Sequence, residues 1–308
     1  DNPKDVENLV SNIVKNILDK EKHIKIKQNN INRIIKEELL NNQKSDTYSY
    51  SYPKIKEIKK SNRLDTGIYE EEFNKLDFLI SNYKNGYFQI PEKMFSSGST
   101  PKVRVFNPKN ENYLWVTPTL ISDEGFYNPT QTINMKGKNN ILKDCILIIN
   151  RTSRGKKGEY VGISCFYDFE KYGVGHHNQG LYRISGYSKE EQLFLVSLLN
   201  SEIYRKICGC ISIGSKMKEM KVADFTEVKF LNFPKNVRDK IIKEYYNEYK
   251  VSENESLTLY SYENYFKFRN SELGIFQNSL ELVQLRKQLE DIVDKIINNK
   301  KITIDNYL

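Results

Sequence analysis

The chain has 308 residues, 38% of them hydrophobic, which is enough to bury one large core or two modest ones. Its formal net charge of +8 suits a polyanionic partner, because each phosphate neutralised by Lys or Arg releases condensed counterions. The sequence lacks both a signal peptide and the roughly 18-residue apolar run of a membrane span. We therefore expect a cytoplasmic protein that has no membrane partner.

The first helix is predicted over residues 4–43, where apolar residues recur at three- and four-residue steps from Val6 to Leu39. Asn29, Asn30 and Asn32 interrupt the stripe, so the sequence is compatible with one bent helix or with a helical pair. Either arrangement needs a partner surface, because isolated helices are marginal in water. A polar linker follows, and then a helix at about 69–85.

From about residue 86 to residue 187 the pattern predicts strands. Short apolar runs at 103–106, 113–116, 145–149 and 160–166 are separated by Gly, Pro, Asn and Ser. Trp115 stands among apolar neighbours, so we expect it in the core.

Helical spacing returns in the C-terminal part of the chain. It predicts helices at 189–207, 235–250 and 272–299, with Ser188 as the N-cap of the first and a polar loop over 251–271. The predicted fold class is α+β, with a mixed-sheet body flanked by long N- and C-terminal helices.

The sequence contains no recognisable catalytic centre. A DNA methyltransferase needs a Gly-rich turn for its methyl donor and a Pro-containing loop for the flipped base, and none of the three Asn-Pro pairs continues in that way. The Glu-x-Lys triplets are as frequent as chance predicts in so charged a chain. Of the four cysteines, Cys145, Cys165, Cys208 and Cys210, the last two are too close together for an ordinary disulfide or a zinc-knuckle spacing, and no second pair matches them. We expect reduced thiols, no metal, no cofactor and no catalysis by this chain alone.

Four segments carry the most information. They are SSGSTPK at 96–102, YLWVTP at 113–118, LKDCILI at 142–148 followed by Arg151, and ISIGSKM at 211–217. In this order they resemble the target-recognition domain of type I restriction specificity subunits and of type IIG-like adenine DNA methyltransferases. Residues 62–65, Asn-Arg-Leu-Asp, with Tyr69 are similar to the segment that opens such domains. The resemblance covers residues 64–250, and it departs from the usual pattern at Asn150-Arg151-Thr152, where a simpler Arg-x-Gly turn is common.

The resemblance implies a bacterial restriction–modification function, in which the chain binds a specific sequence in double-stranded DNA and directs adenine methylation, with cleavage left open. The implied organisation is an N-terminal helical spacer at 1–43, a linker at 44–63, a target-recognition domain at 64–250, and a loop and long helix at 251–308. A methyltransferase domain or subunit is the implied partner.

Basic loops are the expected DNA contacts, because Arg can bind guanine bidentately while Lys anchors phosphates. Backbone amides of a Gly-Ser turn can also meet a phosphate. The candidate residues are Thr100, Lys102 and Arg104; Arg151, Arg154, Lys156 and Lys157; and Ser215, Lys216 and Lys218.

Three versions of the function stay open. Because the chain begins at Asp1 and not at Met, we expect the C-terminal specificity part of a longer type IIG-like methyltransferase. A stand-alone, half-sized specificity subunit would instead form a homodimer through its terminal helices. A helical protein-interaction module without DNA readout is the third version.

Overall fold

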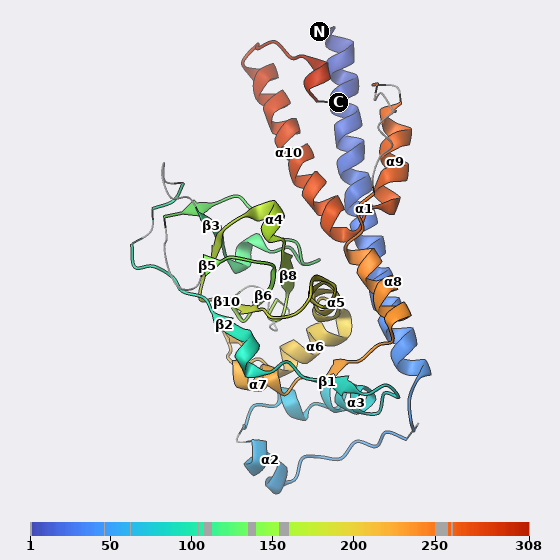
Figure 1. Cartoon of the computed structure of the whole chain (residues 1–308), viewed down its shortest axis with the longest axis vertical. Coiled ribbons are helices and arrows are strands. Elements are labelled where there is room, and N and C mark those ends of the chain that lie inside the picture. The colour runs from blue at the N-terminus through green and yellow to red at the C-terminus, as the bar shows by residue number, and fades with distance from the viewer. Residues whose placement is uncertain are drawn as a thin grey trace. The chain divides into compact units, whose positions relative to one another are not determined.

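The computed structural model describes residues 2–45, 47–61, 63–103, 105–107, 113–134, 140–153, 160–249, 258–259 and 261–307. The chain forms two compact units (Figure 1). One consists of Asp1–Asn30 with Ile242–Leu308, and the other of Ile31–Ile241. The fold is α+β with long terminal helices, which confirms the predicted class. Over the described residues, none of the helices combines the length and the apolarity that a membrane crossing requires.

The unit of the two termini is helical. The first part of α1 (Pro3–Asn41) runs beside α9 (Tyr262–Glu272) and α10 (Ile275–Ile297), as Figure 1 shows. Its apolar core includes Leu9, Ile13 and Ile292, all at most 1% exposed. The heptad-like spacing of α10 therefore serves helix packing within this unit.

A buried polar layer crosses the same helices. Lys20 is 1% exposed, and its ammonium group donates to Asn270 Oδ1 at 2.6 Å and to Glu281 Oε2 at 2.7 Å. Burial lowers the pKa of Lys20, although the carboxylate of Glu281 opposes this shift. A buried cation needs such partners, because desolvation of an unpaired charge is very costly.

The α1 helix is one continuous element of 39 residues, which excludes the helical pair that the sequence left open. Two of the three asparagines that suggested a break bond to neighbouring elements instead. Asn30 Nδ2 donates to Glu244 Oε2 at 3.3 Å, within the helical unit. Asn32 Oδ1 accepts from the amide of Glu202 at 3.1 Å, within the second unit.

The second unit is built on two four-stranded sheets. The first is antiparallel with the order β2-β10-β6-β8, and the second has the order β4-β3-β9-β5, in which β3 and β9 are parallel. In chain order these strands are β2 (Phe95–Ser97), β3 (Tyr113–Val116), β4 (Thr132–Ile133), β5 (Asn140–Ile141), β6 (Cys145–Ile149), β8 (Ser164–Tyr167), β9 (Gly175–His177) and β10 (Leu181–Ile184). Two short strand pairs also occur: β1 (Tyr87–Phe88) with β12 (Phe230–Leu231), and β7 (Arg151–Thr152) with β11 (Lys218–Glu219).

The core of this unit lies around β6 and β8, in which every residue is buried. Continuous apolar runs such as Cys145–Ile149 are typical of strands covered on both faces. Helix α5 (Lys189–Leu199) packs on this sheet. It begins with a complete capping box between Ser188 and Glu191, as the sequence predicted for the N-cap.

Several predicted boundaries are wrong. The helix predicted at 189–207 is two helices, α5 and α6 (Glu202–Ile211), because the hydroxyl of Ser201 accepts from the amide of Tyr204 and starts a new helix. The linker contains α2 (Ile55–Ser61), and the loop predicted at 251–271 contains α9. Residues 103–106 were predicted as a strand, but among the described ones Val103 is 80% exposed and Phe106 makes an isolated bridge to Ile133.

The remaining helices are short. They are α3 (Glu71–Ser81), α4 (Phe169–Tyr172), α7 (Val222–Thr226) and α8 (Lys235–Tyr245), with 3₁₀ turns at Gly67–Tyr69, Glu92–Met94, Pro118–Leu120 and Ile304–Asn306.

Candidate nucleic-acid interface

A three-residue turn, Asn178 to Gly180, joins β9 of one sheet to β10 of the other. The side chain of Asn178 closes the turn by accepting a hydrogen bond from the amide of Gly180 at 2.9 Å. The backbone carbonyl of Asn178 accepts from the amide of Leu181 at 3.1 Å. An Asn side chain that bonds to its own backbone two residues later gives a turn with a defined shape.

The segments that leave β2, β3 and β6 all bond to this turn or to the residues flanking it. The bonds run from Gly98 N to Leu181 O (3.3 Å), Ser99 N to His177 O (3.2 Å), Asn178 N to Val116 O (3.0 Å) and Asn150 N to Gly180 O (3.1 Å). We call the turn and these three segments the sheet junction. Three of the four informative sequence segments therefore meet at one place.

Two glycines allow this close approach. A Cβ atom at Gly98 would lie 2.0 Å from the backbone oxygen of Asn178. A Cβ atom at Gly180 would lie 2.9 Å from Cγ of Pro118 and 3.4 Å from the backbone oxygen of Arg151. The glycine of the SSGSTPK segment is thus required by backbone packing, and not by a left-handed conformation.

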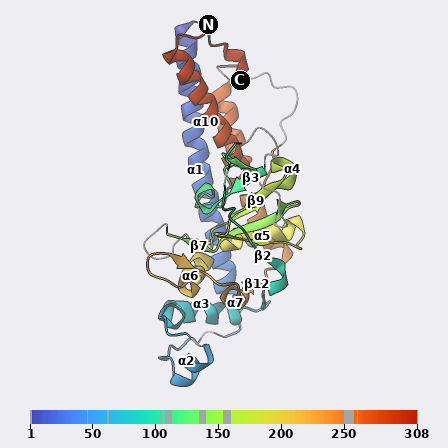
Figure 2. The ribbon, with the colours of Figure 1, turned by 90° about the vertical axis from the view of Figure 1, so that its left-hand side faces the viewer.

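The fourth segment reaches the junction through a short ribbon. In the β7–β11 pair, Lys218 lies opposite Thr152 and Glu219 opposite Arg151. The amide of Met220 donates to the carbonyl of Asn150 at 2.8 Å. Strands β2, β7 and β9, which carry or adjoin these segments, are labelled in Figure 2.

The predicted DNA-binding residues fall into three sets. The structure brings Arg151, Ser215, Lys216 and Lys218 together on and beside the β7–β11 ribbon, where the first three are exposed and Lys218 is half-buried. Thr100, half-buried, and Lys102, exposed, follow Ser99 on the first segment. Arg104, Arg154, Lys156 and Lys157 lie outside the described residues.

Arg151 is positioned by the facing segment. Its Nε lies 2.7 Å from the sulfur of Met217, which precedes β11. The turn before Met217 contains Gly214 at a φ of +105°, where a Cβ atom would also meet the carbonyl of Met217 at 2.1 Å. The ribbon thus presents an exposed guanidinium group from a defined backbone.

Two buried histidines lie beneath the first segment. His176 Nε2 is 3.1 Å from the hydroxyl of Ser99, and its Nδ1 is 3.2 Å from Oδ1 of Asn140. The ring of Trp115, 2% exposed as expected for a core residue, stacks on His176 with centroids 5.6 Å apart. Burial lowers the pKa of His177 to about 3. We infer that His177 is neutral at physiological pH and that both histidines have a structural role.

Arg63 and Asp65 belong to the segment that resembles the start of a target-recognition domain, and they form an ion pair. Arg63 Nε donates to Asp65 Oδ1 at 2.8 Å, and its NH1 lies 3.2 Å from Asp224 Oδ1. The hydrogen bonds from Arg63 hold the pKa of Asp65 below its usual value, and the charge of Lys218 adds to this shift. Tyr69 donates its hydroxyl to the carbonyl of Arg63 at 2.9 Å. These contacts indicate a structural role for Arg63.

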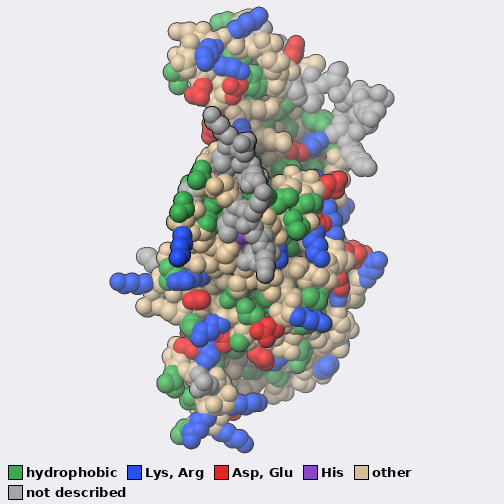
Figure 3. Space-filling model, turned by 60° about the vertical axis from the view of Figure 1, so that its left-hand side comes forward, with side chains coloured by type: hydrophobic (Ala, Val, Ile, Leu, Met, Phe, Trp, Pro, Cys, Tyr) green, Lys and Arg blue, Asp and Glu red, His purple; other side chains and the backbone are tan. Residues whose placement is uncertain are grey.

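Charges of both signs share the surface. On the face that Figure 3 draws, described Lys and Arg side chains are interspersed with Asp and Glu. Any contact with a polyanion on this face would depend on individual basic side chains held by particular loops. A large single-sign field would act differently, by attracting the partner over a distance.

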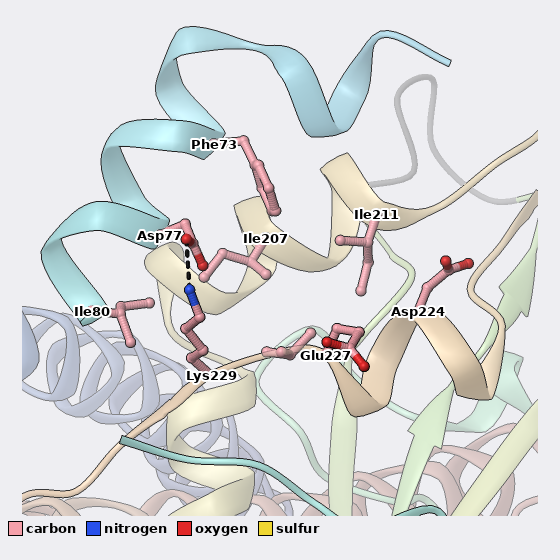
Figure 4. Close-up of a pocket in the computed structure, with 9 residues that line it drawn as sticks. Phe73, Asp77, Ile80, Ile207, Ile211, Asp224, Glu227 and Lys229 are labelled. Atoms are coloured by element: carbon pink, nitrogen blue, oxygen red, sulfur yellow. Dashed lines mark hydrogen bonds and ion pairs between the residues drawn. The ribbon is translucent and has the colours of Figure 1, made fainter. Parts of the chain in front are cut away.

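A small cleft of about 50 Å³ lies between α3, α6 and the segment after α7 (Figure 4). Phe73, Ile207 and Ile211 give it an apolar lining, and on its rim Lys229 Nζ pairs with Asp77 Oδ2 at 2.7 Å. Such a volume accommodates a few water molecules or a small chemical group.

The described residues hold no group of three or more His, Cys, Asp or Glu side chains that could bind a metal ion. All four cysteines are free. Burial raises the pKa of Cys145 and of Cys208 to about 12, so neither thiol is activated as a nucleophile.

Comparison with solved structures adds a structural similarity. No family model matches the sequence, and no curated protein matches it. Among solved structures, a chain from work on complex assembly and conformational transition of the type I R-M system is similar, with a TM-score of 0.38 and 12% identity. The match covers 68% of this chain and 44% of that chain, so this chain spans less than half of the length of its structural neighbour.

Proposed function

We propose that this chain recognises a specific sequence in double-stranded DNA, as the specificity part of a bacterial restriction–modification system. The observation that carries the proposal is the sheet junction. Four segments whose order resembles a target-recognition domain lie far apart in the sequence, yet three bond to one turn and the fourth pairs with the third. Loops that a rigid scaffold holds together are the usual place for binding residues.

The basic residues of the junction and of the β7–β11 ribbon have two kinds of role in the proposal. Arg151 extends an exposed guanidinium group that can contact a guanine edge or a phosphate, because its planar donors suit bidentate acceptors. Lys216 and Lys218 contribute point charges for phosphates. Lys102 supplies a similar contact from the first segment. The ring of His176, stacked on Trp115, supports that segment through its contact with Ser99.

In this proposal methyl transfer to adenine belongs to a separate domain or subunit, and this chain supplies no cofactor site. The helical unit is the surface on which that partner docks. The chain is either the C-terminal part of a type IIG-like methyltransferase or a half-sized type I specificity subunit. Light scattering separates these versions, because only the second forms a homodimer by itself.

The experiment is enrichment of bound duplexes from a random-sequence library at several salt concentrations. We expect the full chain to enrich one sequence motif. Arg151→Glu with Lys216→Glu should weaken binding to all duplexes, and each lost phosphate contact should lower the slope of log affinity against log salt by about 0.9. Lys75→Glu, an exposed charge reversal on α3, is the matched control and should change little.

A protein-interaction module is the second candidate, and exposed apolar side chains of the helical unit favour it. Leu18 is 59% exposed, Phe268 58% and Ile297 71%. If the chain enriches no motif and the charge reversals leave its DNA affinity unchanged, this second function replaces the first.

A further inference from the structure

We propose that Gln179 is a base-reading side chain, and that it recognises an adenine in the major groove. The inference rests on the proposed function and names one specificity-determining residue. None of the four segments that resemble a target-recognition domain includes Gln179, which lies between the third and the fourth of them.

Gln179 occupies the centre of the sheet junction. Its two neighbours in the turn hold it in place. The amide of Asn178 donates to the carbonyl of Val116 in β3, and the carbonyl of Gly180 accepts from the amide of Asn150 after β6. The backbone on one side of the turn touches Gly98, and on the other side it lies against Pro118. The Cα position of Gln179 is therefore determined by three segments at once.

The side chain of Gln179 differs from its surroundings in exposure. Gly180 and His177 are buried and Asn178 is half-buried, whereas Gln179 is exposed. Within the described part of the chain, the Gln179 amide has no hydrogen-bonding partner, so both its donor and its acceptor are available. The backbone of the turn is already ordered, so binding would have to fix only the rotamers of the Gln179 side chain.

An amide side chain is suited to one base. Gln offers a donor and an acceptor side by side, and these match N7 and the N6 amino group of adenine in the major groove. Gln carries no charge, so it contributes nothing to the counterion release that dominates non-specific affinity. The backbone of Arg151 adjoins the same turn, because its carbonyl oxygen would lie 3.4 Å from a Cβ atom at Gly180.

The test compares the full chain with Gln179→Ala, Gln179→Glu and the control Gln131→Ala, an exposed glutamine that precedes β4. Each protein selects duplexes from the random-sequence library, and its affinity is measured for the wild-type motif and for an unrelated duplex. A thermal melt of each variant checks the fold.

We expect Gln179→Ala to lose the preference for adenine at one position of the motif. Its affinity for the wild-type motif should fall by roughly 5- to 150-fold, the discrimination of one bidentate pair, with affinity for unrelated DNA and the salt slope unchanged. Gln179→Glu should select cytosine at the same position, because a carboxylate accepts from the cytosine N4 amino group. Gln131→Ala should select the wild-type motif.

If Gln179→Ala and Gln179→Glu select the same motif as the wild-type chain, the inference is wrong while the proposed function stands. If the wild-type chain enriches no motif, the proposed function fails and the inference falls with it. A uniform loss of affinity for all duplexes, with an unchanged motif, would also reject base reading by Gln179.

Discussion

The amide of Asn150 donates a hydrogen bond of 3.1 Å to the carbonyl of Gly180, and this contact joins the end of β6 to the turn between the two sheets. The same turn binds the segments that follow β2 and β3. Arg151 comes directly after Asn150, so the position of its backbone depends on the turn. A disturbance of the turn should therefore affect several candidate DNA contacts together.

Gly98→Ala tests this dependence. The added Cβ atom would lie 2.0 Å from the backbone oxygen of Asn178, so the first segment or the turn must shift. We expect a loss of about 1–3 kcal/mol in the free energy of unfolding and weaker motif enrichment. Chemical denaturation and library selection measure the two effects.

Gly209→Ala is the matched control, because nothing lies within 4 Å of a Cβ atom at this helical position of α6. Alanine there should be neutral or stabilise the protein by about 0.5–1 kcal/mol. Equal effects of the two substitutions would contradict the tight packing inferred at Gly98.

His177 makes the stability of the protein depend on pH. Its folded-state pKa of about 3 lies below the ordinary 6.5, so the unfolded chain takes up a proton between these values while the native state does not. Stability is therefore lost as the pH falls from 6.5 towards 3. At pH 4.5 the free energy of unfolding should be lower than at neutral pH by roughly 2–3 kcal/mol on account of His177.

Denaturation of His177→Gln at pH 7.5 and pH 4.5 checks the effect. The difference in unfolding free energy between the two pH values should be smaller in the variant than in the wild-type protein. His23→Gln, at a histidine of α1 that is 20% exposed, is the control and should retain most of the wild-type pH dependence. An unaltered pH dependence in His177→Gln would show that the buried ring is not responsible.

Arg63→Ala removes the cation shared by Asp65 and Asp224. We expect a loss of about 1.5–3 kcal/mol, the usual range for hydrogen bonds to charged groups. Because Arg63 lowers the folded-state pKa of Asp65 below 3.8, its contribution is present above that pH and is lost as the pH falls through the lowered value. The destabilisation by Arg63→Ala should therefore be smaller at pH 2.5 than at pH 7, and a constant difference would argue against ion pairing.

Lys20→Met tests the buried polar layer of the helical unit. The substitution leaves Asn270 without the ammonium donor, while Glu281 keeps Arg269 as a partner, so we expect a loss of about 1.5–3 kcal/mol. Lys15→Met removes an exposed ion pair with Glu263 and should cost at most about 1 kcal/mol. Urea titrations of both variants measure the difference, and similar losses would rule out a special role for Lys20.

The sequence by itself determined the elements whose signals are local. The apolar run 145–149 predicted the buried strand β6, Ser188 predicted the start of α5, and the apolar neighbours of Trp115 predicted its burial. The spacing of apolar residues and the capping of helices depend on residues within a few positions of one another, so they can be detected in the sequence alone. The α+β class follows from the order of these local patterns.

Only the tertiary structure decided how the four informative segments are combined. Their meeting at the turn from Asn178 to Gly180 depends on hydrogen bonds between strands that are distant in the sequence, and no local pattern reports such pairing. The same holds for Asn30 and Asn32, whose neighbours in space keep α1 continuous where composition suggested a break. Gln179 is inconspicuous in the chain, and its exposure on a buried turn exists only because two sheets bring their loops to the same point.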